Sequence, residues 1–497
     1  MKKNHFSLRR KAYALMSLAA GVLLFASCAQ DGFDEESFDS GVYNTQLEAP
    51  STDDIQITAS ADGTQQTISW PVVYGAGGYH AILTNTTAGE VLIDSVYDGT
   101  SFAVARVEDN NYELSLEVLG NEERNNKGCE PVIKTFNTFA AAFASIPSGT
   151  DLYEYFQNNP LPDLQESDLI YDLEPGGQYT MSGKVDFGAQ NSMIRVIGDN
   201  NALITCSDGA CFIFGNGFKM QNINIDNTDN TANGLFTMSD TPSESLSTEA
   251  LGYKAAGANQ NGYVMTKPVS LKNVNVKNLK KSLIYGNKTN WSLTNLIIEN
   301  CIIQLDNDGS NGVINMYGAS NGLIKSIQIS NNTFYNLKEN SSAYFLRYSN
   351  SSNAQPQKIF GTDQKATITF THNTVANVFT GKDFANNLAN TNLITTTMTD
   401  NIFYDVFRVY QFIQTNTIKT TTNNYIWWVK TSPQTNDTSR TDNNGNPLCT
   451  EADPGFPTME TLQALDFNAV NCGVNFTPTG TPLSGMAGDP RWLPAAE

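Results

Sequence analysis

The sequence predicts an all-β chain in which a small β-sandwich is followed by a parallel β-helix with end caps. The main observation is a degenerate repeat in the second half: an Asn, three or four strand-type residues, then Asn, Gln, Asp or Trp, then Leu or Val. Successive copies begin 23 to 41 residues apart, a spacing typical of stacked coils of chain. The copies begin at Asn273, Asn300, Asn332, Asn373, Asn401 and Asn424.

The composition agrees with stacked β-coils. Charged residues make up only 16% of the 497 residues, which suits turns and polar side-chain ladders and argues against a helical bundle. The formal net charge is −20, yet residues 273–430 hold 13 Lys and Arg against 8 Asp and Glu. The predicted β-helix is therefore locally basic, and its charge does not exclude an acidic ligand.

The first residues have the pattern of a targeting segment. Five basic residues within residues 2–11 precede an apolar stretch that is too short to span a membrane as a stable helix. The stretch ends in Leu-Phe-Ala-Ser-Cys28, which resembles a bacterial lipobox, in which the Cys is lipidated and becomes the new N-terminus. We therefore expect a lipoprotein signal peptide over residues 1–27, lipidation of Cys28 and a flexible tether over residues 28–50.

Residues 51–136 have the pattern of a small β-sandwich. Trp70 ends one alternating strand, and a Gly-Ala turn leads from there to Tyr79. This arrangement resembles a fibronectin type III domain, which implies that Trp70 packs in the core and that Tyr112 is the corner tyrosine. The module would then act as a spacer. The alternating segments are residues 66–70, 80–84 and 111–118.

The predicted β-helix spans residues 137–430, and a C-terminal cap follows over residues 431–497. Because the open end of a stack exposes unpaired strand edges, we expect a short amphipathic helix at residues 151–157 to cover it. Two long polar segments, 241–262 and 348–364, are expected to be loops that project from single coils. The repeated Asn residues are expected to be structural, since Asn tolerates left-handed backbone angles and aligned Asn side chains form hydrogen-bonded ladders.

The cysteines predict no metal centre. Seven are present, no two are spaced as CxxC, and the chain beyond the signal peptide has only His80 and His372. An exported chain permits disulfides, and Cys449 with Cys472 is a candidate pair in the C-terminal cap.

The repeat resembles the right-handed parallel β-helix of the pectate-lyase-like superfamily. The order of signal peptide, fibronectin-like module and β-helix resembles poorly characterised exported proteins of gut glycan-utilisation systems. This resemblance implies a polysaccharide ligand in a groove along one parallel sheet. It also implies that, in an enzyme of this kind, an Arg or Lys removes the proton beside a uronate carboxylate, commonly assisted by calcium.

The candidate binding residues come from the strands that follow each Asn segment. If these strands stack, an outward stripe of aromatic, amide and guanidinium groups forms, which is the chemistry that sugar recognition needs. Arg347 is also a candidate catalytic base, with Lys281 as a second. Trp428, on the last repeat, is a candidate sugar platform. The predicted stripe consists of Tyr285, Asn315, Tyr317, Arg347 and Gln411.

The sequence leaves three functions open. The favoured one is a surface-exposed outer-membrane lipoprotein that binds a polysaccharide, with a pectin-like polyuronate as the candidate ligand, beside other glycan-utilisation surface proteins. The alternatives are a polysaccharide lyase acting by β-elimination on the same groove, for which Ca²⁺ is a possible cofactor, and a structural or adhesive surface protein. No acidic cluster that would serve a lyase is evident, and no nucleic-acid motif is present, so nucleic acid is not an expected partner.

Overall fold

The computed structural model describes residues 41–495, except for residues 62, 254–261, 287–289, 310, 318–321, 340–341 and 458–461. The chain forms two compact units that meet in sequence between Ala141 and Ala142. The expected signal peptide, the lipidated Cys28 and most of the tether lie outside the described residues. Within the described part, no helix is long and apolar enough to cross a membrane.

The first unit is a sandwich of two antiparallel sheets, in the orders β1-β2-β5 and β4-β3-β6-β7. Trp70 is buried between them, with its ring 5.4 Å from that of Tyr79. The Tyr112 hydroxyl donates a hydrogen bond to the Val107 carbonyl at 3.3 Å, as a corner tyrosine does. The predicted small β-sandwich is therefore confirmed. Its strands are β1 (Gln56–Ala59), β2 (Gln65–Ser69), β3 (Gly78–Asn85), β4 (Glu90–Tyr97), β5 (Ser101–Ala105), β6 (Asn111–Leu119) and β7 (Val132–Asn137), with η2 (Glu122–Arg124) between the last two.

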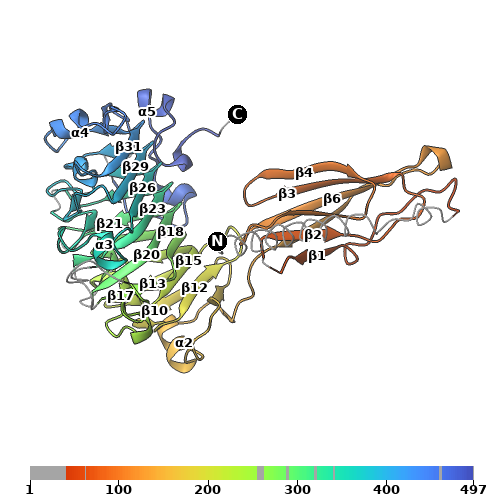
Figure 1. The fold of residues 1–497 in the computed structure, drawn as a ribbon, viewed down its shortest axis with the longest axis horizontal. Coiled ribbons are helices and arrows are strands. Elements are labelled where there is room, and N and C mark those ends of the chain that lie inside the picture. The colour runs from red at the N-terminus through yellow and green to blue at the C-terminus, as the bar shows by residue number, and fades with distance from the viewer. Residues whose placement is uncertain are drawn as a thin grey trace, which may run out of the picture. The chain divides into compact units, whose positions relative to one another are not determined.

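The second unit is a parallel β-helix, as predicted, and its strands stack coil upon coil along one axis (Figure 1). Each full coil contributes one strand to each of three walls, here called walls A, B and C. Walls A and B belong to one 19-stranded sheet, because β15 (Gly217–Asp226) and β18 (Val269–Leu279) continue through the bend between them. Wall C is a separate sheet of seven strands. The side chains that point inward form one continuous apolar core.

The walls have the following strands besides β15 and β18. Wall A contains β8 (Ala144–Ile146), β9 (Leu169–Leu173), β12 (Asn191–Val196), β17 (Tyr263–Met265), β20 (Trp291–Glu299), β23 (Ile324–Ser330), β26 (Ala366–Thr371), β29 (Ile394–Thr399) and β31 (Ile418–Thr422). Wall B contains β10 (Gln178–Met181), β13 (Ala202–Cys206), β21 (Ile302–Leu305), β24 (Thr333–Asn336), β27 (Thr374–Ala376), β30 (Ile402–Tyr404), β32 (Tyr425–Trp427) and β33 (Thr450–Glu451). Wall C contains β11 (Lys184–Asp186), β14 (Cys211–Phe214), β16 (Gly234–Met238), β19 (Ser282–Tyr285), β22 (Ile314–Asn315), β25 (Leu346–Arg347) and β28 (Ala385–Asn386).

The bend between walls A and B uses two adjacent columns of side chains. The first column has left-handed backbone angles, with φ between 51° and 60°, which Asn and Asp adopt more readily than other non-glycine residues. The second column, one residue later, is buried. Asn300 belongs to the first column and Asn332 to the second, so the predicted alignment of these two repeats was wrong by one residue. The first column is Asn222, Asn273, Asn300, Asn331, His372, Asp400 and Asn423.

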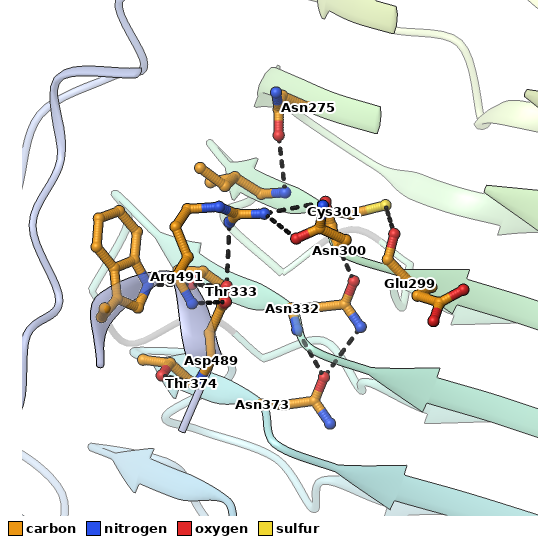
Figure 2. Close-up of polar contacts among 12 residues, drawn as sticks. Asn275, Glu299, Asn300, Cys301, Asn332, Thr333, Asn373, Thr374, Asp489 and Arg491 are labelled. Atoms are coloured by element: carbon orange, nitrogen blue, oxygen red, sulfur yellow. Dashed lines mark hydrogen bonds and ion pairs between the residues drawn. The ribbon is translucent and has the colours of Figure 1, made fainter. Parts of the chain in front are cut away.

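The second column forms a ladder of buried amides (Figure 2). Asn332 donates to Asn373 at 3.0 Å, and Asn373 donates in turn to Asn401 at 3.1 Å. Asn401 then donates to Asn424 at 2.8 Å. Because each amide oxygen also accepts the backbone N–H of the coil before it, the ladder satisfies buried polar groups at the bend. The predicted structural role of these Asn residues is confirmed.

Both ends of the stack are covered. Helix α2 (Leu152–Asn158) covers the first coil as predicted, with the Asp151 side chain accepting from Glu154 N at 3.1 Å and with Leu152 and Phe156 in the core. At the other end, Leu448 and Cys449 join the core beside α4 (Thr435–Ser439).

The C-terminal segment also runs back along wall B, which the sequence did not indicate. Phe456, Phe476 and Trp492 pack on the outward side chains of wall B, with Tyr335 and Ile402 among them. This segment holds η6 (Val470–Gly473), α5 (Gly480–Ser484) and η7 (Pro490–Trp492).

A partly buried clasp, with Asp489 at its buried end, fixes this segment (Figure 2). Arg491 donates to Asp489 at 3.0 Å and to the Asn300 side chain at 2.8 Å, while Asp489 accepts from Thr333 Oγ1 at 2.8 Å. Gly488 approaches so closely that an added Cβ would lie 2.8 Å from Thr374 Oγ1, and its φ of +94° favours glycine.

Short helices lie within the two predicted long loops, and one expected disulfide is absent from the described cysteines. Loop 348–364 contains the short helix α3 (Pro356–Ile359), and the described part of loop 241–262 contains η3 (Glu244–Leu246). The six described cysteines are free thiols, so the candidate bridge between Cys449 and Cys472 does not form in this structure. These two cysteines lie in different apolar clusters.

Candidate functional site

The outward side of wall C carries a column of polar and aromatic side chains. Tyr285 is in register with Asn315, Asn315 with Arg347, and Arg347 with Asn386. The neighbouring residues Ile284, Ile314 and Leu346 point into the core, so strand alternation turns this column outward. Because adjacent strands are about 4.8 Å apart, the column presents one side chain per coil at that interval. The structure therefore brings three of the predicted residues together.

Arg347 is the most specific group in the column. Its guanidinium lies 3.9 Å from the centre of the Tyr317 ring and 5.2 Å from that of Tyr344. No carboxylate pairs with it among the described residues, and its buried Nε–H has no acceptor there. The other arginines of the β-helix contact carboxylates or carbonyl oxygens, for example Arg408 with Asp383 at 3.2 Å. Arg347 is thus oriented by aromatic rings, and the described residues leave its hydrogen-bonding capacity unused.

The chemistry of this arrangement favours a carboxylate-bearing or hydroxyl-rich ligand. A guanidinium binds a carboxylate through two parallel hydrogen bonds, and a desolvated one does so more strongly. Tyr317 is 49% exposed, so part of its ring remains open for stacking against the apolar face of a sugar. Asn315 is buried by its neighbours, and its Oδ1 accepts from Tyr317 N at 3.2 Å. Asn315 therefore positions Tyr317 and offers no exposed surface of its own.

A cleft of about 470 Å³ continues wall C toward the first coils. Tyr285 and Lys281, both predicted site residues, line it together with Lys184 and Thr237. The Lys281 ammonium donates to Asn233 Oδ1 at 3.2 Å. With two lysines and one aspartate in its lining, the cleft has a cationic balance and extends the surface on which Arg347 lies.

Two local details shape this cleft. Gly234 leaves room for Tyr285, because an added Cβ would lie 2.2 Å from the tyrosine Cβ. Burial raises the pKa of the Cys211 thiol, which also lines the cleft, so this cysteine stays protonated at neutral pH and is not a reactive thiolate. Among the described residues, no group of three or more His, Cys, Asp and Glu is placed to hold a metal ion.

Two predicted residues lie away from the column. Gln411 was expected on a strand, but residues Val409–Phe412 form the 3-10 helix η5 instead, and the Gln411 side chain accepts from Gln414. Wall C therefore ends at β28, one coil earlier than expected. Trp428 lies at the bend after β32 and packs against the core of the β-helix, so its ring is half-buried.

Sequence reasoning missed four residues of this face. Tyr344 lies beside the Arg347 guanidinium, and Lys184 lines the cleft. Thr237 extends the column beyond Tyr285, and Asn386 extends it beyond Arg347. Strand β28 has only two residues and carries no pattern of its own, so nothing in the sequence indicated Asn386.

The fold and this face together define a parallel β-helix protein with aromatic and cationic groups along one wall. Comparison with family models divides the chain into two parts. Residues 1–175 match a domain of unknown function, DUF4992, and residues 177–337 match a second domain of unknown function, DUF4957. The second match includes Tyr285, Asn315 and Tyr317.

Comparison with the curated proteins gives no match. Among solved structures, the crystal structure of the pectate lyase Pel3 from Pectobacterium carotovorum matches with 10% sequence identity, over 67% of this chain and 88% of that chain, and with a TM-score of 0.17. At that TM-score the match supports no inference about structure or activity. The β-helix is established by the strand pairings of the chain itself.

Proposed function

We propose that the protein binds an acidic polysaccharide, of the polyuronate class, along the outward column of wall C. The observation that carries this proposal is Arg347, whose guanidinium is held by Tyr317 and Tyr344 and has no carboxylate partner among the described residues. A uronate carboxylate supplies the missing acceptor, while the tyrosine rings stack on the sugar. Lys184 and Lys281 in the adjoining cleft add attraction for further carboxylates of the same chain.

The place of action is a further part of this proposal. The lipobox at Cys28 and the acidic residues that follow it support an outer-membrane lipoprotein exposed at the cell surface, beside other proteins of a glycan-utilisation system. The fibronectin-like sandwich would serve as a spacer.

Protease treatment of intact cells should degrade the wild-type protein. The Cys28→Ser variant should lose the lipid label and be released from the membrane fraction. Retention of the lipid label by Cys28→Ser would refute lipidation at this residue.

The binding proposal is tested with an arginine pair. The purified chain is titrated with polygalacturonate and with a neutral glycan, and Arg347→Ala is compared with Arg408→Ala, which removes the same charge from an arginine already paired with Asp383. We expect Arg347→Ala to weaken polygalacturonate binding by about tenfold or more, as for a lost charge-assisted contact, and Arg408→Ala to change it little. Thermal melts of both variants control for folding.

The same titration separates the alternatives. Equal affinity of wild type and Arg347→Ala for polygalacturonate would contradict the proposal, as would the absence of binding. A steady rise in the ultraviolet absorbance of unsaturated uronides, abolished by Arg347→Ala or Lys281→Ala, would instead identify a polysaccharide lyase.

A further inference from the structure

The side chains on the outward side of wall B differ between the coils near the C-terminal end of the stack (late coils) and those near its N-terminal end (early coils). In the late coils its outward column carries Ile302, Thr333 and Ile402, and the C-terminal segment covers it. In the early coils the register-matched positions carry Asn224, which is half-buried, and Asn275, which is buried, and both line a cleft together with residues 466–468 of the C-terminal segment. Two asparagines thus stand where the covered coils carry isoleucine and threonine.

This open part of wall B forms a cleft of about 660 Å³. Seven amide side chains and three aspartates line it, together with Lys277 and the ring of Phe467. Phe467 belongs to the C-terminal segment, which therefore forms one side of the cleft. The Lys277 ammonium lies 3.4 Å from Asp226 Oδ2, so the single cation in the lining is already paired.

Hydrogen bonds within the lining hold the amides in fixed orientations. The Asn224 Oδ1 accepts from Asn275 Nδ2 at 2.9 Å and from Asn201 Nδ2 at 3.2 Å. This leaves the Asn224 Nδ2 with no acceptor in the described part of the chain. Asn275 is held further because its own Oδ1 accepts from Ile302 N at 3.1 Å. The cleft therefore presents the Asn224 Nδ2 as a pre-oriented donor, which binds with little loss of side-chain entropy.

The charge of this cleft is opposite to that of the wall C face. Three carboxylates against one ammonium disfavour an acidic chain, whereas amides and carboxylates hydrogen-bond hydroxyl groups. An aromatic ring at the edge suits the apolar face of a sugar. We propose that the wall B cleft is a second binding site, for an uncharged oligosaccharide. This site rests on its own residues and does not depend on the function proposed for wall C.

Binding to immobilised neutral glycans tests this site. The panel is a galactan, an arabinan, a mannan and a β-glucan, with polygalacturonate for comparison. The Asn224→Asp variant keeps an acceptor for Asn201 and Asn275 but removes the donor pair. The Phe467→Ala variant removes the ring from the C-terminal segment and leaves the wall unchanged. Arg408→Ala, at an arginine that is paired with Asp383 outside both proposed sites, serves as the control.

We expect at least one neutral glycan to be retained, and Asn224→Asp and Phe467→Ala each to weaken that retention by about fivefold or more, as for loss of one hydrogen-bonded or stacked contact. Arg408→Ala should leave neutral retention unchanged. No retention of any neutral glycan, or retention that both cleft variants leave intact, would overturn the proposal. If the polyuronate-binding proposal for wall C is wrong, polygalacturonate binding will be absent or will not change in Arg347→Ala, whatever the result for neutral glycans.

Discussion

The Arg347 guanidinium lies over the Tyr317 ring at 3.9 Å, and the two residues belong to adjacent coils of the β-helix. This contact couples the stacking of the coils to the candidate site, because a shift of one coil would separate the pair. It also fixes a long, flexible side chain without neutralising its charge.

Replacement of Tyr317 by Ala tests the ring apart from the charge. We expect affinity for polygalacturonate to fall about twofold to thirtyfold, since a cation–π contact is worth ~0.5–2 kcal/mol. Stability should change little, because the ring is 49% exposed. Isothermal titration calorimetry measures the first quantity and a thermal melt the second. Unchanged affinity would show that the ring takes no part in binding.

Replacement of Asn373 by Ala tests the amide ladder. Its side chain is fully buried, donates to Asn401 and accepts from Asn332. Each buried group left without a partner costs ~1–3 kcal/mol, so we expect the free energy of unfolding to fall by ~3 kcal/mol or more. Calorimetry of the β-helix transition measures the loss, with the exposed Asn436→Ala as control. Equal melting of the two variants would contradict a stabilising ladder.

Asp437 predicts a pH dependence of stability. Burial raises the pKa of this carboxyl to about 7, and the nearby Arg440 and Arg408 oppose the shift only in part. Its Oδ1 accepts from Tyr410 N at 2.7 Å, and its buried Oδ2 has no partner among the described residues. Between about pH 4 and pH 7 the folded state therefore binds more protons at Asp437 than the unfolded state does. The contribution of Asp437 to stability is present below about pH 4 and is lost as the pH rises through about 7.

The Asp437→Asn variant isolates this effect, because the amide keeps an acceptor for Tyr410 N and does not ionise. We expect it to be more stable than wild type at about pH 8, and the advantage to shrink or vanish at about pH 4 to 5. Urea unfolding at both pH values measures the difference. A difference between the two proteins that is independent of pH would rule out titration of Asp437 as its source.

The clasp at Asp489 predicts a local effect on the C-terminal segment. Removal of one partner from a buried ion pair leaves the other charge uncompensated, which costs ~3–5 kcal/mol. In Asp489→Ala we therefore expect faster hydrogen exchange over the C-terminal segment and at β24 and β27, with wall A little changed. Exposed Glu451→Ala is the control. Exchange rates equal to wild type in Asp489→Ala would show that the clasp does not hold the segment.

The sequence predicts those features that depend on local periodicity. Comparison of the strands that follow each Asn segment, together with two-residue alternation, placed Tyr285, Asn315 and Arg347 in one column. Which Asn of each repeat takes the left-handed position at the bend, and which takes the buried one, was predicted less well. Where Asn residues are doubled, as at Asn331 and Asn332, one fits the left-handed position and the next fits the buried ladder.

Other features depend on contacts between distant segments, which no local pattern encodes. The packing of the C-terminal segment on wall B joins Trp492 to Thr333, 159 residues apart, and this contact determines where wall B remains open. Gln411 was misplaced because residues 409–412 have strand-type composition but form the 3-10 helix η5. The backbone N–H of Tyr410 in this helix donates to Asp437, which is distant in sequence.

A crystal structure of the mature chain with a galacturonic acid oligosaccharide is the measurement that addresses the binding face itself. We expect the sugar chain to follow the column from Tyr285 to Arg347, with one carboxylate hydrogen-bonded to the Arg347 guanidinium and one ring stacked on Tyr317. An oligosaccharide bound on another wall, with the Arg347 guanidinium unliganded, would contradict the assignment of wall C.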